Sequence, residues 1–169
     1  MNKTRSLVFI AILIAIEVIL TRFFAIETPI VRIGFGFIAI SLSSMLFGPL
    51  VGGITAALAD VLGMMIFPKG AFFPGFTLSA FLGGLTYGIF LYNRPKSWLN
   101  IFLAVFIITL FINLGLNTLW IAMMTGKAYI VLLVPRIIKE IIVLPIQILV
   151  IHLTWEYIGK NIREKLFVL

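Results

Sequence analysis

The sequence predicts an all-α integral membrane protein with six transmembrane helices and both termini in the cytoplasm. Of its 169 residues, 62% are hydrophobic and only 11% are charged, whereas a soluble domain has about 45–50% apolar and about 25% charged residues. A bilayer core about 30 Å thick requires roughly 20 apolar residues per helix, so this chain holds about six spans joined by short loops. We therefore expect residues 1–169 to form a single membrane-embedded domain.

Six apolar runs are separated by polar residues or by glycine and proline. We expect helices over residues 6–24, 34–47, 49–67, 75–92, 97–124 and 135–160. The second run is short for a full span. The first run carries Glu17 and lacks a small-residue cleavage site, which predicts a retained helix rather than a signal peptide. Pro145 should kink the last helix unless neighbouring groups satisfy the freed carbonyl.

Basic residues predict the orientation in the membrane. Six spans place both termini on one side, and seven of the 13 basic residues fall on that side: Lys3, Arg5, Arg94, Lys96, Lys160, Arg163 and Lys165. The positive-inside rule makes this side cytoplasmic. The other six lie at outward helix ends or in outward loops: Arg22, Arg32, Lys69, Lys127, Arg136 and Lys139. Any one of them can snorkel to lipid headgroups, but six together indicate a vestibule that attracts an anion.

The segment NLGLNTLW carries two amides and an indole at helical spacing. Asn113 and Asn117 are four residues apart, and Trp120 follows three residues later on the same face. An amide both donates and accepts hydrogen bonds, and an indole stacks on flat rings. This pattern favours a ligand with an aromatic ring and amide-like edges. The alternative is that the asparagines form hydrogen bonds between helices.

The segment PRIIKE is expected to open the last helix, with Pro135 at its first position. Arg136 and Lys139 would then add to the positive end of the helix dipole and favour a bound ligand carboxylate. The alternative is that Arg136 pairs with Glu140, four residues later.

Glu17 and Asp60 are isolated acids within apolar runs. Such acids are typical of secondary carriers coupled to protons or sodium, although the chain lacks the paired broken helices and repeated halves of those carriers. The alternative is that each acid bonds a neighbouring helix or stays protonated.

Small residues recur at four-residue spacing in two of the runs. Ala11 and Ala15 do so in the first, and Ala80, Gly84 and Gly88 in the fourth. Such stripes let two helices approach closely, either within the protein or at a partner.

Residue types that enzymes depend on are scarce in this sequence. It contains no cysteine and one histidine, His152, and it lacks a nucleophile–base pair and a GxxxxGK[ST] phosphate loop. We expect no enzymatic activity, no metal and no cofactor. The net charge of +7 does not indicate a nucleic-acid partner, because no soluble basic face is available to bind one. Energy for any pumping must come from another subunit.

Four segments together resemble a known family: RIGFGFIAISLSSMLFGPLVGGITAALADVLG, FFPGFTLSAFLGGLTYGIFLY, NTLWIAMMTGKA and PRIIKEIIVLPIQ. They are similar to the substrate-binding S components of energy-coupling factor (ECF) vitamin transporters, and within these to the folate-specific members. The resemblance covers nearly the whole chain. FFPGFTLSAF and NTLW are its specific parts, whereas FGPLxGG is shared more widely.

The resemblance implies a fold in which six helices enclose an outward-opening pocket, covered by the loops after helices 1, 3 and 5. It further implies a multi-pass protein of the prokaryotic plasma membrane that docks on a transmembrane coupling protein and two cytoplasmic ATPases. Family members use an Ala-x-x-x-Ala motif of helix 1 against the coupling protein, which corresponds here to Ala11 and Ala15.

Folate matches the residues singled out above, because it joins a flat pterin and a second ring to a glutamate with two carboxylates. Expected ligand-binding residues are Arg32, Lys69, Phe73, Phe76, Asn117, Thr118, Trp120, Lys127, Arg136 and Lys139. The alternatives are an S component for another vitamin, such as riboflavin or pantothenate, a proton-coupled carrier that uses Glu17 and Asp60, and a non-transporting structural membrane protein.

Overall fold

The structure, a computed structural model, describes residues 3–27, 32–68 and 70–167. Within these ranges the predicted six helical segments are confirmed. They are α1 (Lys3–Arg22), α2 (Phe37–Phe47), α3 (Pro49–Ile66), α4 (Pro74–Leu91), a fifth segment of α5 (Trp98–Ile107), η1 (Ile108–Leu116) and α6 (Asn117–Thr125), and a sixth of α7 (Tyr129–Thr154), η2 (Trp155–Gly159) and α8 (Lys160–Phe167). The segments η1 and η2 are π-helical. A short antiparallel pair, β1 (Ile26–Glu27) with β2 (Arg32–Ile33), is the addition to the all-α prediction.

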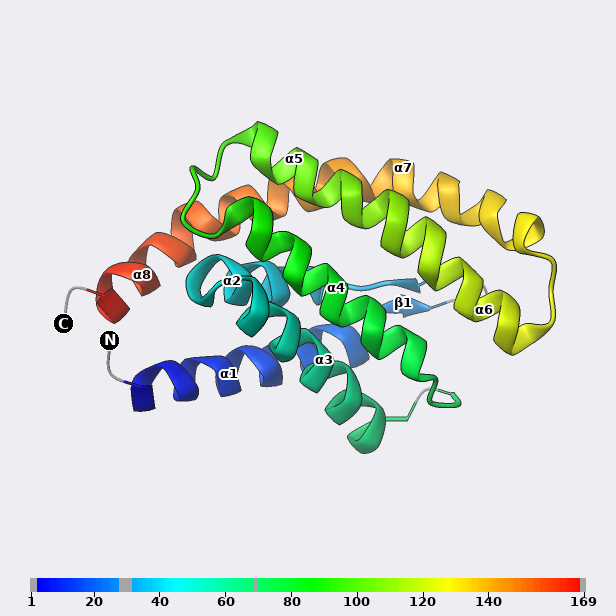
Figure 1. The fold of residues 1–169 in the computed structure, drawn as a ribbon, viewed down its shortest axis with the longest axis horizontal. Helices are drawn as coiled ribbons and strands as arrows, with labels where there is room; N and C mark the ends of the chain where they lie inside the picture. The colour runs from blue at the N-terminus through cyan, green and yellow to red at the C-terminus, as the bar shows by residue number, and fades with distance from the viewer. Residues whose placement is uncertain (1–2, 28–31, 69, 168–169) are drawn as a thin grey trace.

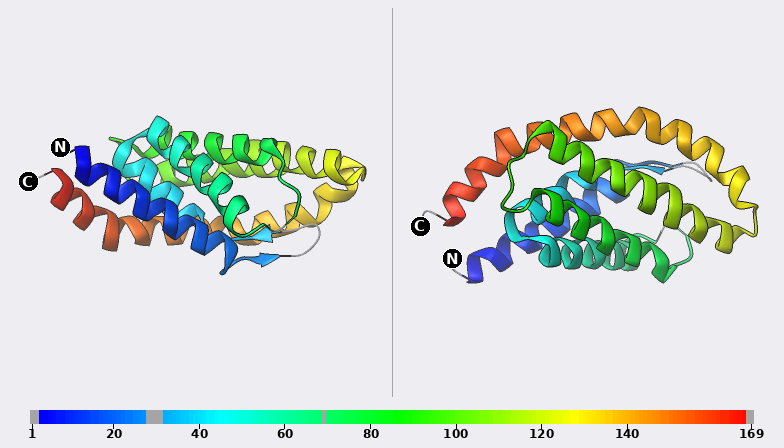
Figure 2. Two further views of the ribbon diagram at one scale, coloured as in Figure 1. Left: turned by 90° about the horizontal axis from the view of Figure 1, so that it is seen from below. Right: turned by 45° about the horizontal axis from the view of Figure 1, so that its top comes forward.

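The helices form an elongated bundle whose chain ends lie together (Figure 1). The start of α1 and the end of α8 lie at one end, and the α6–α7 connection and the strand pair lie toward the other (Figures 1 and 2). Among the described residues, five helices are long and apolar enough to cross a membrane. The eleven residues of α2 are too few for a full span. The positive-inside rule assigns the end with the termini to the cytoplasm.

The hydrophobic core lies toward the end that holds the termini. Leu46, Leu91, Ile101 and Ile151 are at most 2% exposed and belong to one cluster that joins α2, α4, α5 and α7. Outward-facing apolar residues such as Ile141, which is 69% exposed, face the lipid. This core leaves the outer half of the bundle free to hold a cavity.

The sixth helical segment begins at Tyr129 rather than at residue 135, so the predicted N-terminal position of Pro135 is wrong. Proline removes one backbone donor, and helices within a membrane protein tolerate this where neighbouring groups compensate. Arg136 and Lys139 therefore lie beyond the first turn of α7. The helix dipole cannot explain an anion site at these two residues, because its effect falls off within that turn.

Gly84 and Gly88 pack against α3 within the protein, which confirms internal contact for this part of the small-residue stripe. A Cβ at Gly84 would lie 2.4 Å from the carbonyl oxygen of Gly52, and one at Gly88 would lie 2.1 Å from the Cα of Pro49. The Ser44 hydroxyl also donates a 2.8 Å hydrogen bond to the Gly84 carbonyl, which joins α2 to α4.

We expect Gly84→Ala to destabilise the protein by about 1–3 kcal/mol, because the new methyl group must push α3 and α4 apart. Thermal unfolding of the purified protein in detergent measures the effect. Gly83→Ala is the matched control, since a Cβ there meets no atom within 4 Å and alanine favours the helix. Equal unfolding midpoints for the two variants would contradict the close α3–α4 contact.

Candidate functional site

A cavity of about 550 Å³ occupies the outer half of the bundle. All six helical segments and the loop before α4 contribute to its wall, and its size is that of a small-molecule site. Its aromatic and polar lining residues include Thr21, Arg22, Phe37, Asp60, Phe72, Phe73, Phe76, Ser79, Tyr87, Asn113, Asn117, Thr125, Arg136, Lys139 and Gln147.

Phenylalanines at the start of α4 form one wall of the cavity. Phe73 and Phe76 both line it, with ring centroids 6.1 Å apart and planes at 72°. Trp120 lies behind them, 5.6 Å from the Phe73 centroid, and its Nε1–H donates a 3.0 Å hydrogen bond to the Ser79 hydroxyl. A side chain at Gly75 would come within 2.7 Å of the indole. Glycine there therefore lets Trp120 support Phe73, and the indole itself is not part of the cavity lining.

Gly75 is the second residue of α4, which Pro74 opens from the N1 position. This glycine is therefore helical. Gly70, with φ of 126°, adopts the backbone conformation that other residues rarely reach.

Two amides from the fifth helical segment face the cavity together. The Asn117 Nδ2 donates to Asn113 Oδ1 at 3.4 Å, which confirms that the two share a face. Neither Asn117 Oδ1 nor Gln147 Oε1 has a hydrogen-bond partner among the described residues, and both residues line the cavity. Buried acceptors without partners are costly, so these oxygens are suited to accept N–H groups from a ligand.

Thr118 is fully buried and lies outside the cavity lining. Its hydroxyl donates a 3.3 Å hydrogen bond to the main-chain oxygen of Asn113. The structure therefore places Thr118 within the helix packing and not beside the two amides.

Two of the five cations expected to bind the ligand, Arg136 and Lys139, line the cavity from α7. Arg136 donates to the main-chain oxygen of Asn117 at 3.3 Å. Lys139 Nζ lies 2.5 Å from Glu140 Oε1. The other carboxylate oxygen, Glu140 Oε2, accepts a 3.5 Å hydrogen bond from Thr109. Glu140 is thus paired with Lys139, so the alternative in which it pairs with Arg136 is wrong.

The other three predicted cations belong to the outer connections. Lys127 is exposed in the turn that follows the left-handed Gly126, away from the cavity lining. Lys69 lies outside the described residues, and Arg32 is described only as part of the backbone of β2.

The ion pair between Arg22 and Asp60 at the cavity was not predicted, whereas the alternative in which Asp60 bonds a neighbouring helix is confirmed. Arg22 is 5% exposed and lines the cavity, with Nη2 3.9 Å from Asp60 Oδ1 and 3.5 Å from the Asp60 main-chain oxygen. Asp60 also accepts a 2.8 Å hydrogen bond from Thr77. Arg22 therefore does not extend to lipid headgroups. Glu17, 4% exposed, lies outside the lining, and its Oε2 has no hydrogen-bond partner among the described residues.

Ala11 and Ala15 lie on the outer face of α1, where both are exposed. Leu13 and Glu17 of the same helix face the interior. The two alanines therefore do not take part in packing within this chain, and they leave a shallow strip on its surface.

Comparison with known proteins gives one consistent family. The family profile described as "ECF transporter, substrate-specific component" matches residues 5–154. The folate transporter FolT of Clostridium novyi (strain NT) is 52% identical over 160 residues, which cover 95% of this chain and 93% of that protein. FolT of Leuconostoc mesenteroides is 36% identical over 86% of this chain and 81% of its own length.

A solved structure shares the fold as well as the sequence. A crystal structure of FolT bound with folic acid superposes with a TM-score of 0.88 at 43% identity, covering 94% of this chain and 95% of that one. With the profile match over most of the sequence, the chain belongs to the family of substrate-specific components of ECF transporters.

Proposed function

We propose that this chain binds folate on the outer side of the prokaryotic plasma membrane and delivers it inward as the S component of an ECF transporter. The observation that carries the proposal is a single cavity lined by phenyl rings, unpartnered amide oxygens and cations. Two relatives are named folate transporters, and the similar solved structure is described as bound with folic acid. A transmembrane coupling protein and two ATPase subunits supply the energy.

In this proposal the pterin lies against the aromatic wall. Phe73 and Phe76 contact its flat face, and Trp120 holds Phe73 in place. Asn117 and Gln147 accept hydrogen bonds from pterin N–H groups, since their side-chain oxygens lack partners among the described residues.

The glutamate end of folate meets the cations of the cavity. Arg22, Arg136 and Lys139 line it; Asp60 pairs with Arg22 and Glu140 with Lys139, so Arg136 is the lining cation without an acidic partner among the described residues. A ligand carboxylate complements this charge. Riboflavin carries no carboxylate, and pantothenate carries one and has no aromatic ring. The same cavity is therefore less complementary to either vitamin.

The outer connections attract the ligand before it enters. Arg32, Lys69 and Lys127 lie on the three connections that follow α1, α3 and α6. Cations around the mouth of a cavity raise the local concentration of an anion. We assign all three residues to this long-range attraction of the folate anion.

The exposed face of α1 contacts the coupling protein in this proposal. Ala11 and Ala15 present a strip free of large side chains on that face, and small residues at this spacing allow a second helix to approach closely.

The test is a ligand titration of the purified chain. Folate, riboflavin and pantothenate are added in separate titrations while tryptophan fluorescence is recorded, because Trp120 lies beside the wall formed by Phe73. We expect saturable quenching by folate at micromolar or lower concentration and a weaker response to the other two vitamins. Absence of folate quenching at micromolar ligand would contradict the proposed substrate.

A further inference from the structure

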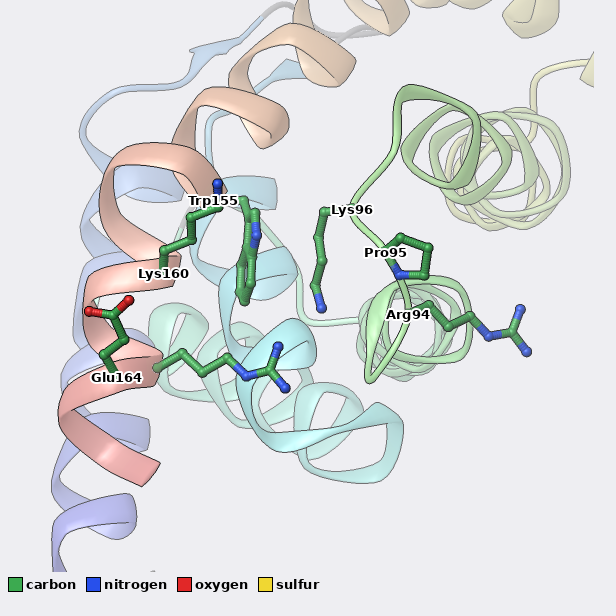
Figure 3. Close-up of a pocket in the computed structure, with 7 residues that line it drawn as sticks. Arg94, Pro95, Lys96, Trp155, Lys160 and Glu164 are labelled. Carbon is green, nitrogen blue, oxygen red and sulfur yellow. The ribbon is translucent and has the colours of Figure 1, made fainter. Parts of the chain in front are cut away.

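A second cavity, of about 430 Å³, opens at the end of the bundle that holds the termini, between the α4–α5 loop and the η2–α8 segment (Figure 3). The residues that line it are Arg94, Pro95, Lys96, Trp155, Lys160, Arg163 and Glu164. The folate proposal uses none of them, and the cavity is on the opposite side of the hydrophobic core from the folate site.

The loop that forms one wall of this pocket is held in place. The Asn100 Nδ2 donates a 2.7 Å hydrogen bond to the carbonyl of Pro95, and Ser97 caps the N-terminus of α5. Lys96 Nζ lies 4.4 Å from the centroid of the Trp155 ring, within the range of a cation–π contact. The Lys96 ammonium thus lies over one face of the Trp155 indole, and Figure 3 shows the two side chains next to each other.

The pocket contains more cationic side chains than the neighbouring acidic side chains neutralise. Lys160 pairs with Glu156 at 2.5 Å, but Arg94, Lys96 and Arg163 form no ion pair with any described acid. Glu164 lies on the far side of Trp155 from the Lys96 ammonium (Figure 3). Burial, followed by the charge of Arg163, lowers the pKa of Lys96 to about 8. An anion in the pocket would offset both the burial and the repulsion.

The surroundings of the pocket indicate what kind of anion it takes. Trp98 and Leu99, directly after the loop, are 52% and 64% exposed, and Trp98 stacks on His152 of α7 with centroids 4.2 Å apart. On the other wall, Tyr157 of η2 is 74% exposed. Exposed tryptophan and tyrosine beside cytoplasmic cations are typical of the membrane–water interface. A ligand at this depth meets water at one end and hydrocarbon at the other.

From this juxtaposition we infer that the pocket binds the phosphodiester headgroup of an anionic phospholipid. Lys96 and Arg163 hold the phosphate over the edge of Trp155, and Arg94 contributes charge at the rim. The acyl chains follow the exposed apolar side chains of Trp98 and Leu99 into the bilayer. Basic pockets between helices on the cytoplasmic side have the chemistry that such headgroups require.

The experiment titrates the full chain in detergent with phosphatidylglycerol and, separately, with phosphatidylcholine, and follows thermal unfolding. Inorganic phosphate and glycerol phosphate, added at millimolar concentration, form the soluble-anion arm. We expect phosphatidylglycerol to raise the unfolding midpoint and the other three additives to leave it unchanged. Stabilisation by inorganic phosphate or glycerol phosphate equal to that by phosphatidylglycerol would overturn the lipid assignment.

Variants locate the site. Lys96→Gln and Arg163→Gln should each raise the half-saturating phosphatidylglycerol concentration about fivefold, and the double variant about 25-fold. Lys96→Arg with Arg163→Lys keeps both charges and should retain most of the affinity. Arg5→Gln removes an exposed cation at the same end of the bundle but outside the pocket, and should leave the titration unchanged. If the double variant changed the titration no more than Arg5→Gln does, the pocket would not be the lipid site.

Discussion

Replacing Arg136 by alanine should weaken folate binding by about 1–3 kcal/mol, a rise of roughly 5- to 150-fold in Kd. Arg136 lines the cavity and donates to a main-chain oxygen of Asn117, while the neighbouring acid Glu140 is paired with Lys139. Its charge therefore remains available to a ligand carboxylate. Isothermal titration of the purified chain with folate measures the change.

Lys127→Ala is the matched control for that measurement. It also removes one positive charge from the outer side, but Lys127 is exposed and outside the cavity lining. Because exposed charges are screened beyond about 8 Å at physiological ionic strength, its Kd should stay within about twofold of the wild-type value. If Arg136→Ala weakened binding no more than Lys127→Ala, Arg136 would not hold a carboxylate.

The helices and part of the cavity could be predicted because they depend on local patterns. Apolar runs of membrane-spanning length, with glycine and proline between them, mark helices wherever a bilayer is the solvent. Asn117 was predicted from its four-residue spacing to Asn113, and Phe73 and Phe76 from the match of an aromatic segment to folate; all three line the cavity. Their common position follows from the alternating direction of the helical segments along the chain.

Residues that reach the cavity through tertiary contacts were harder to predict. Arg22 lies near Asp60 because α1 packs against α3. The Arg22 guanidinium occupies space that a side chain at Gly63 would fill. No local pattern contains that contact. Opposite charges in the outer halves of two apolar runs were the available signal. Gln147 had a comparable signal, because it is an isolated amide in the apolar run of α7.

Changes of helical pitch had no sequence signal. The nine π-helical residues of η1 separate α5 from α6, and Asn113 lies within them. A π-helical turn is uncommon and occurs often at functional sites. Here it lies directly beside the amides, and pattern analysis treated the whole of residues 97–124 as one α-helix. Thr118 was expected to bond the pterin edge of folate, whereas its hydroxyl donates to the main-chain oxygen of Asn113 and it lies outside the cavity lining.

The first helix connects the two proposed contacts of this protein. At its outer end Arg22 lines the cavity and pairs with Asp60, and two to three turns earlier Ala11 and Ala15 lie exposed on the lipid-facing side. In the proposal, α1 therefore contacts the ligand site at its outer end and the coupling protein along its exposed face. Its inner face and outer face can therefore be perturbed separately.

Ala11→Trp should abolish folate uptake by the assembled transporter and leave folate binding to the isolated chain unchanged. The indole would project from an exposed position, so the fold has no need to accommodate it, whereas a partner helix that approaches closely at small residues would be blocked. Uptake of labelled folate into cells or vesicles with the complete transporter, compared with Kd from titration of the purified chain, separates the two effects.

Leu149→Trp provides the control, because Leu149 is 49% exposed on a different helix, α7. We expect normal uptake and normal binding from this variant, since a lipid-facing indole costs little at a position that no partner covers. Uptake that persisted in Ala11→Trp would show that the coupling protein does not dock on this face of α1. An equal loss of uptake in both variants would show that a bulky substitution anywhere on the lipid-facing surface impairs transport, and the assignment of Ala11 and Ala15 to the interface would then fail.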